Sequence, residues 1–358
     1  MLPRSTLIVL FLSIVSFSPG GDMLPGTQPL TSEGDLSAQM VAGIDRWLMH
    51  ETDRAAKARP EKWRLDVSSA EAWEKSLVPK RELLRKMIGA VDERKPGALE
   101  IISEPGAAAK PADGSYTVGR VRWPVFDGVN GEGLLLRPNG PAKAAVIALP
   151  DADNTPEQFA GIAPGLAPEA QFARRLAEQG ALVVVMTLVD RRDTWSGSEK
   201  LKRFTNATHR EWIYRQSFES GRTLTGYEVQ KVLAAVDALR GPSAKLLADG
   251  AKIGVAGYGE GGRTALFSAA LDTRVGAEFV SGAFGCGQSM WKEPLDHNLM
   301  GFTREFGDGE LAAMAQPRDV FPEFADAPVF NGPPPVRDGR RGGAPGSIAT
   351  AAVAGFMR

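Results

Sequence analysis

The chain has few of the residues that build disulfide frameworks or metal centres. Its 358 residues include one cysteine and three histidines. A single cysteine excludes an internal disulfide, and so few histidines argue against a multi-histidine metal centre. Net charge is also nearly absent, since 42 lysines and arginines stand against 43 aspartates and glutamates. Because nucleic-acid binding needs a basic surface, this balance argues against a general nucleic-acid binder.

Long apolar runs are missing as well, and no internal segment is long enough to span a bilayer. Near the start, residues 7–17 form an apolar run after Arg4, interrupted only by Ser13 and Ser16. This run is too short for a transmembrane helix but fits the apolar region of a signal peptide. We therefore expect residues 1–20 to be a signal peptide and the mature protein to be secreted or periplasmic. A buried strand or a misassigned start codon is the alternative.

Composition divides the rest of the chain into four segments. They are a Gly/Pro/Ser/Thr-rich linker, a helical block, a segment of alternating strands and helices, and a Gly/Pro/Arg-rich tail. These segments are residues 21–35, 36–104, 115–330 and 331–358. The tail cannot supply a central strand. Pro322 and Pro328 disfavour a strand over residues 320–330. We therefore expect the C-terminal strands to be incomplete, because the gene product is truncated or the core closes with fewer strands.

The block over residues 36–104 carries helical signals. Ser68 and Glu71 have the spacing of a capping box that opens a short helix. Pro79 is expected to start the next helix, because proline is favoured in the first helical turn. One apolar stripe at helical spacing precedes them and contains Met40, Val41, Ile44, Trp47 and Leu48.

From residue 115 onward, apolar strands alternate with helices. Such strands, nearly uninterrupted by polar residues, indicate a mainly parallel sheet covered by helices on both faces, which is an α/β fold. The expected strands are residues 116–123, 131–137, 144–149, 181–189, 252–256 and 277–281. Helices are expected from Pro168 and over residues 229–239 and 263–271.

The sharpest motif is Gly-Tyr-Gly-Glu-Gly-Gly at residues 257–262, between an expected strand and an expected helix. In that context G-x-S-x-G forms a nucleophile elbow, a turn so tight that the neighbours of the nucleophile must be small. Gly257 and Gly261 supply these neighbours, and Gly262 would let the helix pack closely. The nucleophile position itself is Gly259, which has no side chain.

Two other interpretations of this glycine cluster remain open. Gly257, Gly259 and Gly262 also match G-x-G-x-x-G, a dinucleotide-binding pattern. That pattern normally belongs to the first βαβ unit and is followed by an acidic residue at the end of the next strand. Here two parallel strands precede the turn, and the next strand ends at Ser281 without an acid. The plainest interpretation is a glycine-rich turn that only permits close packing.

Residues 133–140, residues 144–151 and the elbow together resemble an α/β-hydrolase. The similarity covers about residues 115–285 and is strongest to the secreted bacterial dienelactone hydrolases and acetyl xylan esterases, which also have a helical block before the core. Family members have Ser or Cys on the elbow, an acid after a later strand and a His after the last strand. The resemblance implies an ester hydrolase without a cofactor, acting on an acylated carbohydrate. It also implies that the backbone N–H of Glu260 is an oxyanion donor. Tyr258 is the elbow residue on the other side of the vacant nucleophile position.

Three departures from that family pattern favour the alternative of a non-catalytic relative that binds a small ligand or partner. Gly259 replaces the nucleophile. Asp151 and Asp153 stand where many relatives have His-Gly and oxyanion donors, and carboxylates there oppose a developing negative charge. His297 comes too early to follow a last strand and lies in residues 291–306, which suggest cover over the sheet. We therefore assign neither the catalytic acid nor the catalytic base.

Polar residues after two neighbouring strands are the candidates for ligand binding. The carboxyl ends of parallel strands are where ligands bind in open α/β sheets. Such side chains can hold sugar hydroxyls, and a tryptophan can stack on a sugar ring; a solvated loop with a local ion pair is the alternative. Oxygen ligands would also suit a hard cation, but solvated turns are the better interpretation and no metal is expected. The candidates are Asp151, Asp153, Asp190, Arg191, Asp193 and Trp195. His209 is a further candidate: its segment, residues 208–215, precedes the long helix and could reach the same edge, and a surface or helix-start residue is the alternative.

Two residues are fallback nucleophiles if the elbow is inactive. Cys286 follows the strand at 277–281 in a glycine-rich setting, although an unreactive thiol is favoured because no histidine is adjacent. Ser196 lies in the polar loop after the strand at 181–189.

Overall fold

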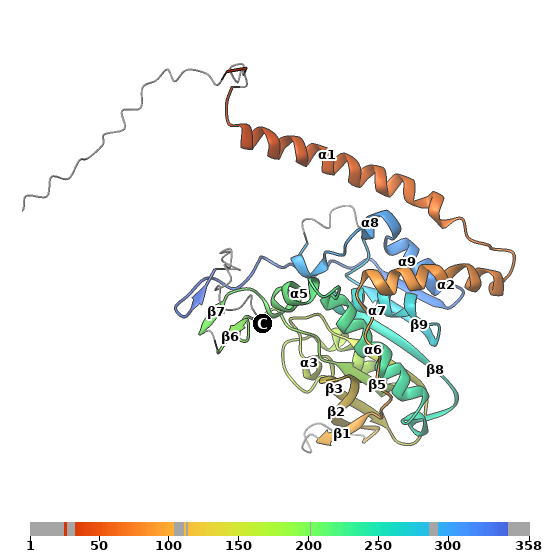
Figure 1. The fold of residues 1–358 in the computed structure, drawn as a ribbon. Helices are drawn as coiled ribbons and strands as arrows, with labels where there is room; N and C mark the ends of the chain where they lie inside the picture. Colours follow the sequence, from red (N-terminus) through yellow and green to blue (C-terminus); the bar gives the residue numbers. More distant parts are fainter. Residues whose placement is uncertain are drawn as a thin grey trace, which may run out of the picture. The chain divides into compact units, whose positions relative to one another are not determined.

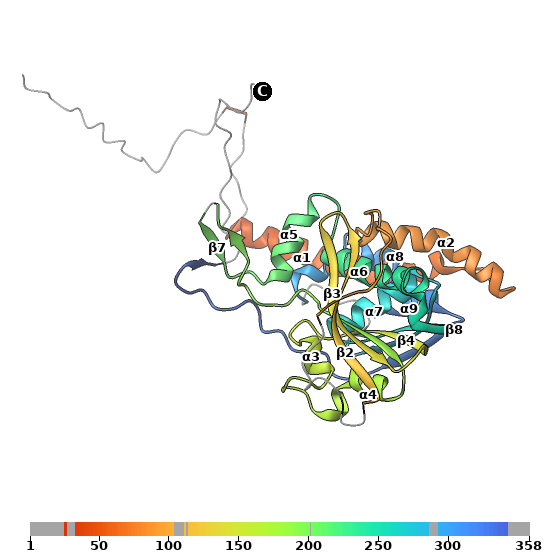
Figure 2. The ribbon, with the colours of Figure 1, turned by 90° about the horizontal axis from the view of Figure 1, so that it is seen from below.

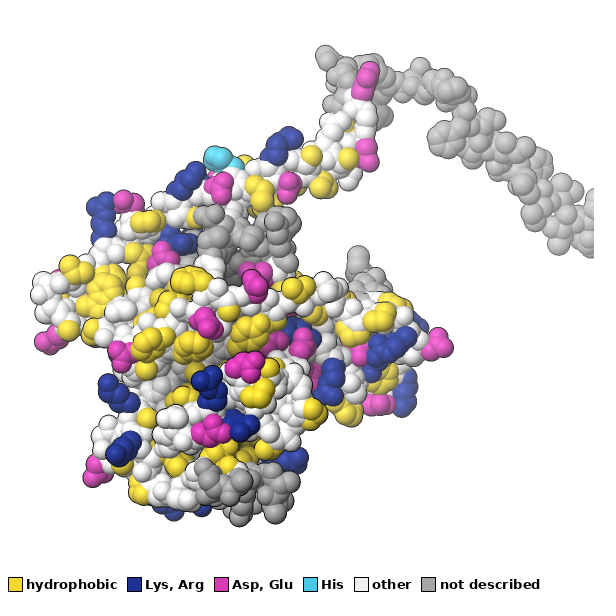
Figure 3. Space-filling model, turned by 180° about the vertical axis from the view of Figure 1, so that it is seen from behind, with side chains coloured by type: hydrophobic (Ala, Val, Ile, Leu, Met, Phe, Trp, Pro, Cys, Tyr) yellow, Lys and Arg dark blue, Asp and Glu magenta, His cyan; other side chains and the backbone are white. Residues whose placement is uncertain are grey.

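The computed structural model describes residues 25–26, 33–103, 111, 114–200, 202–285 and 293–342. The expected signal peptide and Cys286 lie outside these residues. The chain divides into two units, Met1–Glu51 and Thr52–Arg358. Helix α1 (Leu36–Ala58) begins in the first unit, and none of its residues is buried. Its expected apolar stripe is therefore exposed along the helix (Figure 3).

In the second unit, α2 continues through a proline. The N-cap of α2 (Ala70–Met87) is Ser69, whose hydroxyl accepts a hydrogen bond from the Ala72 N–H at 3.0 Å. The cap is thus one residue after the expected Ser68. Pro79 was expected to begin a separate helix, but it lies inside α2. The apolar face that continues on both sides of Pro79, with Leu77 and Leu84 fully buried, outweighs the helix-breaking tendency of proline.

An eight-stranded sheet forms the centre of the second unit (Figure 1). Its strand order is β1-β2-β3-β5-β4-β8-β9-β10. The pairs β1/β2, β2/β3 and β3/β5 are antiparallel, and the five strands from β5 to β10 are parallel. The strands are β1 (Glu100–Ser103), β2 (Tyr116–Phe126), β3 (Val129–Pro138), β4 (Ala142–Leu149), β5 (Leu182–Met186), β8 (Leu247–Tyr258), β9 (Val275–Ser281) and β10 (Asp319–Glu323).

Helices cover both faces of this sheet, as the uninterrupted apolar strands predict (Figure 2). Every residue of β5 is buried, and successive residues of a strand point to opposite faces. Val184 accordingly belongs to one apolar cluster and Val183 to the other. The helices are α3 (Pro156–Phe159), α4 (Phe172–Glu178), α5 (His209–Phe218), α6 (Leu224–Arg240), α7 (Glu260–Leu271), α8 (Phe302–Glu305) and α9 (Asp308–Ala315). Short 3-10 turns are η1 (Arg59–Trp63), η3 (Pro168–Ala170), η4 (Ala244–Leu246) and η6 (Leu295–His297).

The strand β10 corrects the expectation that the sheet would end before residue 320. It pairs in parallel with β9, with Pro322 opposite Val280. A proline is tolerated there because β10 is the edge strand and bonds to a neighbour on one side only. Further along, β11 (Arg340–Arg341) joins a small second sheet with β7 (Arg203–Thr205) and β6 (Gly197–Ser198). Among the helices described, none has the length and apolar character needed to cross a membrane.

The first turn of α7 packs directly on the end of β4, and one glycine makes this contact possible. A Cβ built on Gly261 would lie 1.9 Å from the Leu149 carbonyl oxygen. We predict that Gly261→Ala lowers the free energy of unfolding by about 1–3 kcal/mol, because the added methyl group must displace backbone. Urea unfolding measures the change.

Gly309→Ala is the matched control for this substitution. Gly309 is also in the first turn of a helix, α9, but nothing lies within 4 Å of its added Cβ. The better helix propensity of alanine should leave stability unchanged or raise it by less than about 1 kcal/mol. Equal unfolding free energies for the two variants would contradict the close packing at Gly261.

Candidate functional site

The turn between β8 and α7 has the backbone of an elbow. Gly259, the N-cap of α7, has φ 57° and ψ −122°, outside the regions that residues with a side chain readily adopt. Its N–H donates to the Ser281 carbonyl at 3.0 Å. A Cβ on Gly257 would lie 2.2 Å from the backbone of Gly261, so both neighbours must be small. The tight geometry expected from the motif is therefore present, with no side chain at its apex.

The carboxylate of Asp151 fills the space above Gly259. Asp151 follows β4 and is 2% exposed. A Cβ on Gly259 would lie 2.4 Å from Asp151 Oδ1 and 2.6 Å from Cγ of Pro328. The same Oδ1 accepts a hydrogen bond from the Glu260 N–H at 3.0 Å. The backbone donor expected to serve an oxyanion is thus already used by a carboxylate of the chain.

Arg191 holds Asp151 in this position. Its Nη1 donates to Asp151 Oδ2 at 2.7 Å and to Asp153 Oδ2 at 2.9 Å, and its Nη2 donates to Glu260 Oε1 at 2.9 Å. Burial alone would lower the pKa of the Arg191 guanidinium, but the bond to Asp151 and the neighbouring negative charges raise it above its ordinary value. Arg191 therefore stays charged and ties three carboxylates together.

A second guanidinium, that of Arg210 in α5, lies fully buried beneath the elbow. It donates to Asp296 Oδ2 at 2.8 Å, to Glu228 Oε1 at 2.9 Å and to Glu260 Oε2 at 3.1 Å. Further bonds go to the Val189 carbonyl and to the other Glu228 oxygen, so all five N–H donors are used. Arg210 thereby connects α5, α6, α7 and η6.

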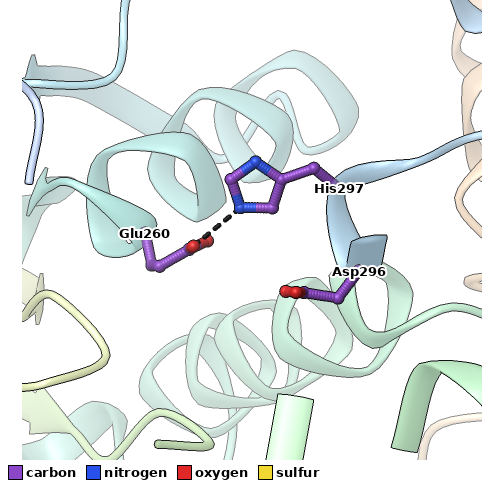
Figure 4. Close-up of side chains that lie close together, drawn as sticks. All are labelled: Glu260, Asp296 and His297. Atoms are coloured by element: carbon purple, nitrogen blue, oxygen red, sulfur yellow. Dashed lines mark hydrogen bonds and ion pairs between the residues drawn. The ribbon is translucent and has the colours of Figure 1, made fainter. Parts of the chain in front are cut away.

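His297 completes the cluster, and its ring is directed at Glu260 (Figure 4). Its Nε2 lies 2.6 Å from Glu260 Oε1, and its Nδ1 lies 2.7 Å from Glu293 Oε2. Burial alone would lower the pKa of His297, but the charge of Glu260 and the hydrogen bonds to both carboxylates raise it above its ordinary value. Because both ring nitrogens are engaged by carboxylates, neither is free to take a proton from a nucleophile.

A cavity of about 500 Å³ opens over these residues. Charged side chains from α7, from η6 and from the segment after β5 line it together with apolar side chains. Residues 325–330 run over the elbow: the Asp326 carbonyl accepts from the Tyr258 hydroxyl at 3.2 Å, and the Phe330 ring faces the Arg191 guanidinium at 5.6 Å. The lining includes Arg191, Gly259, Glu260, Arg263, Leu266, Phe284, Glu293, His297, Phe302, Asp308, Pro328 and Phe330.

Comparison with known proteins gives a structural match only. No family model and no curated protein matches the chain. An assigned acetyl xylan esterase from Bacteroides fragilis superposes with a TM-score of 0.52 at 19% identity, over 70% of this chain and 68% of that one. This chain has the α/β-hydrolase fold. A glucuronoyl esterase from Solibacter usitatus is also similar, with a TM-score of 0.47 at 14% identity, over 73% of this chain and 78% of that one.

Within this α/β-hydrolase fold, the dinucleotide interpretation of residues 257–262 is not supported. A pyrophosphate would need the N-terminus of α7, but the carboxylate of Asp151 occupies the Glu260 N–H there. A metal ion fits poorly as well. Ligand atoms of Glu260, Asp296 and His297 lie within 4.8 Å of one another, yet the guanidinium of Arg210 already bonds to two of these residues.

The remaining candidates from the sequence form a separate cluster with their own partners. His209 Nδ1 lies 2.6 Å from Asp190 Oδ1, and its Nε2 accepts from the Trp195 N–H at 2.8 Å. Asp193 accepts from both Nη atoms of Arg337 at 2.6 and 2.7 Å. Trp195 is 76% exposed. None of these four candidate residues lines the cavity. Among the candidates that follow the two strands, Arg191 lines the cavity, and it donates hydrogen bonds to both Asp151 and Asp153.

Sequence reasoning missed Arg210, Arg263 and His297 as parts of the site. Arg210 and His297 come from segments that read as a helix start and as cover over the sheet. Their partner Glu260 is 50 and 37 residues away along the chain, so no local pattern reveals the contact. A signal existed only for Arg263, which lies one helical turn after Gly259 on α7 and so had to face the same edge of the sheet.

Arg210 gives a test of the buried network. We predict that Arg210→Gln lowers the free energy of unfolding by about 3–5 kcal/mol, because three carboxylates lose a buried cation. The control is Arg215→Gln on the same helix, where the half-exposed pair with Glu211 is worth at most about 1 kcal/mol. Chemical denaturation measures both, and a similar small loss in the two variants would refute the network's importance.

His297 gives a test based on pH. A basic group whose pKa is raised by folding adds stability that is complete below its unfolded pKa, about 6.5, and is lost as pH rises through the folded value. We predict that the unfolding free energy of the wild type falls relative to that of His297→Gln as pH rises from about 6 to 9. The control is His50→Gln in α1, whose side chain is 75% exposed. Parallel pH curves for the wild type and His297→Gln would contradict this assignment.

Proposed function

We propose that this α/β-hydrolase-fold chain is a non-catalytic relative of ester hydrolases that binds a small molecule in the cavity above Gly259. The observation that carries this proposal is the position of Asp151. Its carboxylate occupies the space that a nucleophile side chain would need and accepts the Glu260 N–H.

Acyl transfer through a covalent intermediate has three requirements that these residues do not meet. It needs a side-chain nucleophile, and Gly259 has none. It needs a base within reach, and both ring nitrogens of His297 are already hydrogen-bonded to carboxylates. It needs donors directed at the developing oxyanion, and the carboxylate of Asp151 would repel that charge.

Ligand binding is supported by the cavity itself. Its volume of about 500 Å³ lies in the usual range for small-molecule sites, about 300–1,000 Å³. Apolar side chains such as Leu266 and Phe302 share its wall with Arg263 and His297. This combination of apolar surface and a few convergent polar groups is typical of sites for small molecules, including carbohydrates.

Ester hydrolysis, on an acylated carbohydrate, is the second candidate. The fold supports it, and the solved structures reported above carry esterase names. This candidate needs a nucleophile away from Gly259. The Ser196 side chain is fully buried with an unbonded hydroxyl among the described residues, and Cys286 lies outside them.

A covalent probe separates these two candidates. We predict that a serine-directed fluorophosphonate does not label the wild-type chain and that activated esters give no burst phase. Gly259→Ser should add little turnover, because the new side chain meets Asp151 and Pro328 at a backbone conformation that costs about 1–3 kcal/mol with a Cβ. Intact-mass spectrometry and stopped-flow kinetics measure these outcomes.

Stoichiometric labelling of the wild type would contradict the non-catalytic proposal. Peptide mapping would then identify the modified residue, with Cys286→Ala and Ser196→Ala as the confirming variants. Loss of labelling in either variant would establish ester hydrolysis by a nucleophile off the elbow.

A further inference from the structure

Arg263 differs from the other cations of the site because most of its hydrogen-bonding capacity is unused. It belongs to α7, lines the cavity and has a side chain that is 16% exposed. Its Nη2 donates to the His297 carbonyl at 3.0 Å. Its Nε is buried and has no partner among the described residues. A guanidinium has five N–H donors, and the Arg263 side chain makes one hydrogen bond among the described residues, so Nη1 retains donors for a ligand in the cavity that this residue lines.

No neighbouring carboxylate neutralises Arg263 by a direct hydrogen bond. The nearest is Glu293 Oε2, at 3.8 Å from Nη1, and this carboxylate already accepts from His297 Nδ1 at 2.7 Å. Asp308 also faces Arg263 and accepts the Gly285 N–H at 2.7 Å. Burial raises the pKa of Asp308. Among the described residues, Arg263 therefore has no carboxylate within hydrogen-bonding distance of its guanidinium.

Apolar side chains surround this cation. Leu266, Phe284 and Phe302 line the same cavity, and the Phe267 ring lies 5.3 Å from the Arg263 guanidinium. Apolar walls keep water away and strengthen an ion pair formed inside them. They also give an apolar body a surface to pack against.

We propose that Arg263 binds the carboxylate of a small organic acid whose apolar body packs against Leu266, Phe284 and Phe302. This inference rests on the proposed ligand-binding function and specifies the ligand class. The planar guanidinium matches a carboxylate with two parallel hydrogen bonds. A monoanion is favoured over a phosphate dianion, because the Glu293 carboxylate, 3.8 Å from Arg263 Nη1, would repel a second charge.

Isothermal titration calorimetry of the full chain with three probes tests this proposal. Phenylacetate has both a carboxylate and an apolar ring. Phenylacetamide has the same ring but a neutral amide in place of the carboxylate. Inorganic phosphate has the negative charge but no ring. We expect phenylacetate to bind at least about 10-fold more tightly than phenylacetamide, and phosphate not to compete. Arg263→Gln should weaken phenylacetate binding by about 10–100-fold, and Arg263→Lys by less.

Arg304→Gln is the matched control, since Arg304 is an exposed residue of α8 and the substitution removes the same charge. Its affinity for phenylacetate should equal that of the wild type. The melting temperature of ligand-free Arg263→Gln shows whether that variant is folded. If it is not, the comparison of phenylacetate with phenylacetamide on the wild type and on Arg263→Lys decides the matter.

Several results would overturn the proposal. These are equal binding of phenylacetate and phenylacetamide, displacement of phenylacetate by phosphate, unchanged affinity in folded Arg263→Gln, and no binding of phenylacetate at millimolar concentration. Failure here is distinct from failure of the proposed function. Fluorophosphonate labelling with retained phenylacetate binding would refute the non-catalytic proposal alone, and no labelling without phenylacetate binding would refute only the carboxylate site.

Discussion

The buried guanidinium of Arg210 is the interaction on which the rest of the site depends. It bonds to Glu228 of α6, to Glu260 of α7 and to Asp296 of η6, and all its donors are used. A buried charge of this kind is tolerated only when it is fully paired. The elements that contribute its partners therefore have little freedom to move independently. The orientation of the first turn of α7, and with it the elbow, follows from this constraint.

Glu260 transmits this constraint to the cavity. One carboxylate oxygen is bound by Arg210, and the other is bound by Arg191 and His297. Burial would raise the pKa of Glu260, but these cations lower it well below its ordinary range. Glu260 is thus an anion held in place, and its charge raises the pKa of His297. The same arrangement that stabilises the turn therefore occupies both ring nitrogens of His297, while the Arg263 side chain makes one hydrogen bond among the described residues.

The sequence predicts the local features of this protein better than the contacts between distant segments. Most strands of the sheet and the turn at Gly259 are predictable because strand periodicity and glycine spacing are local, but β1 (Glu100–Ser103) lies in the block that was expected to be helical. The helix through Pro79 and the edge strand containing Pro322 are not, since tertiary packing in one case and edge position in the other override the usual effect of proline. Arg210 and His297 could not be assigned for a similar reason. Their roles arise from partners tens of residues away, and a lone arginine or histidine has no sequence pattern that names its partner.

The pairing of Gly259 with Asp151 explains how the elbow backbone persists without a nucleophile. Glycine adopts φ 57° without the steric cost that a side chain would add there, so the turn is stable without any catalytic gain to offset strain. Removing the side chain also leaves space and an unsatisfied backbone donor, and an unsatisfied buried N–H is itself costly. The carboxylate of Asp151 meets both needs, because it fills the space and accepts the Glu260 N–H. Its own burial is compensated by Arg191, which in turn is held by Glu260. Glycine, carboxylate and guanidinium therefore form an interdependent set, and restoring a hydroxyl at Gly259 alone would break it rather than rebuild a triad.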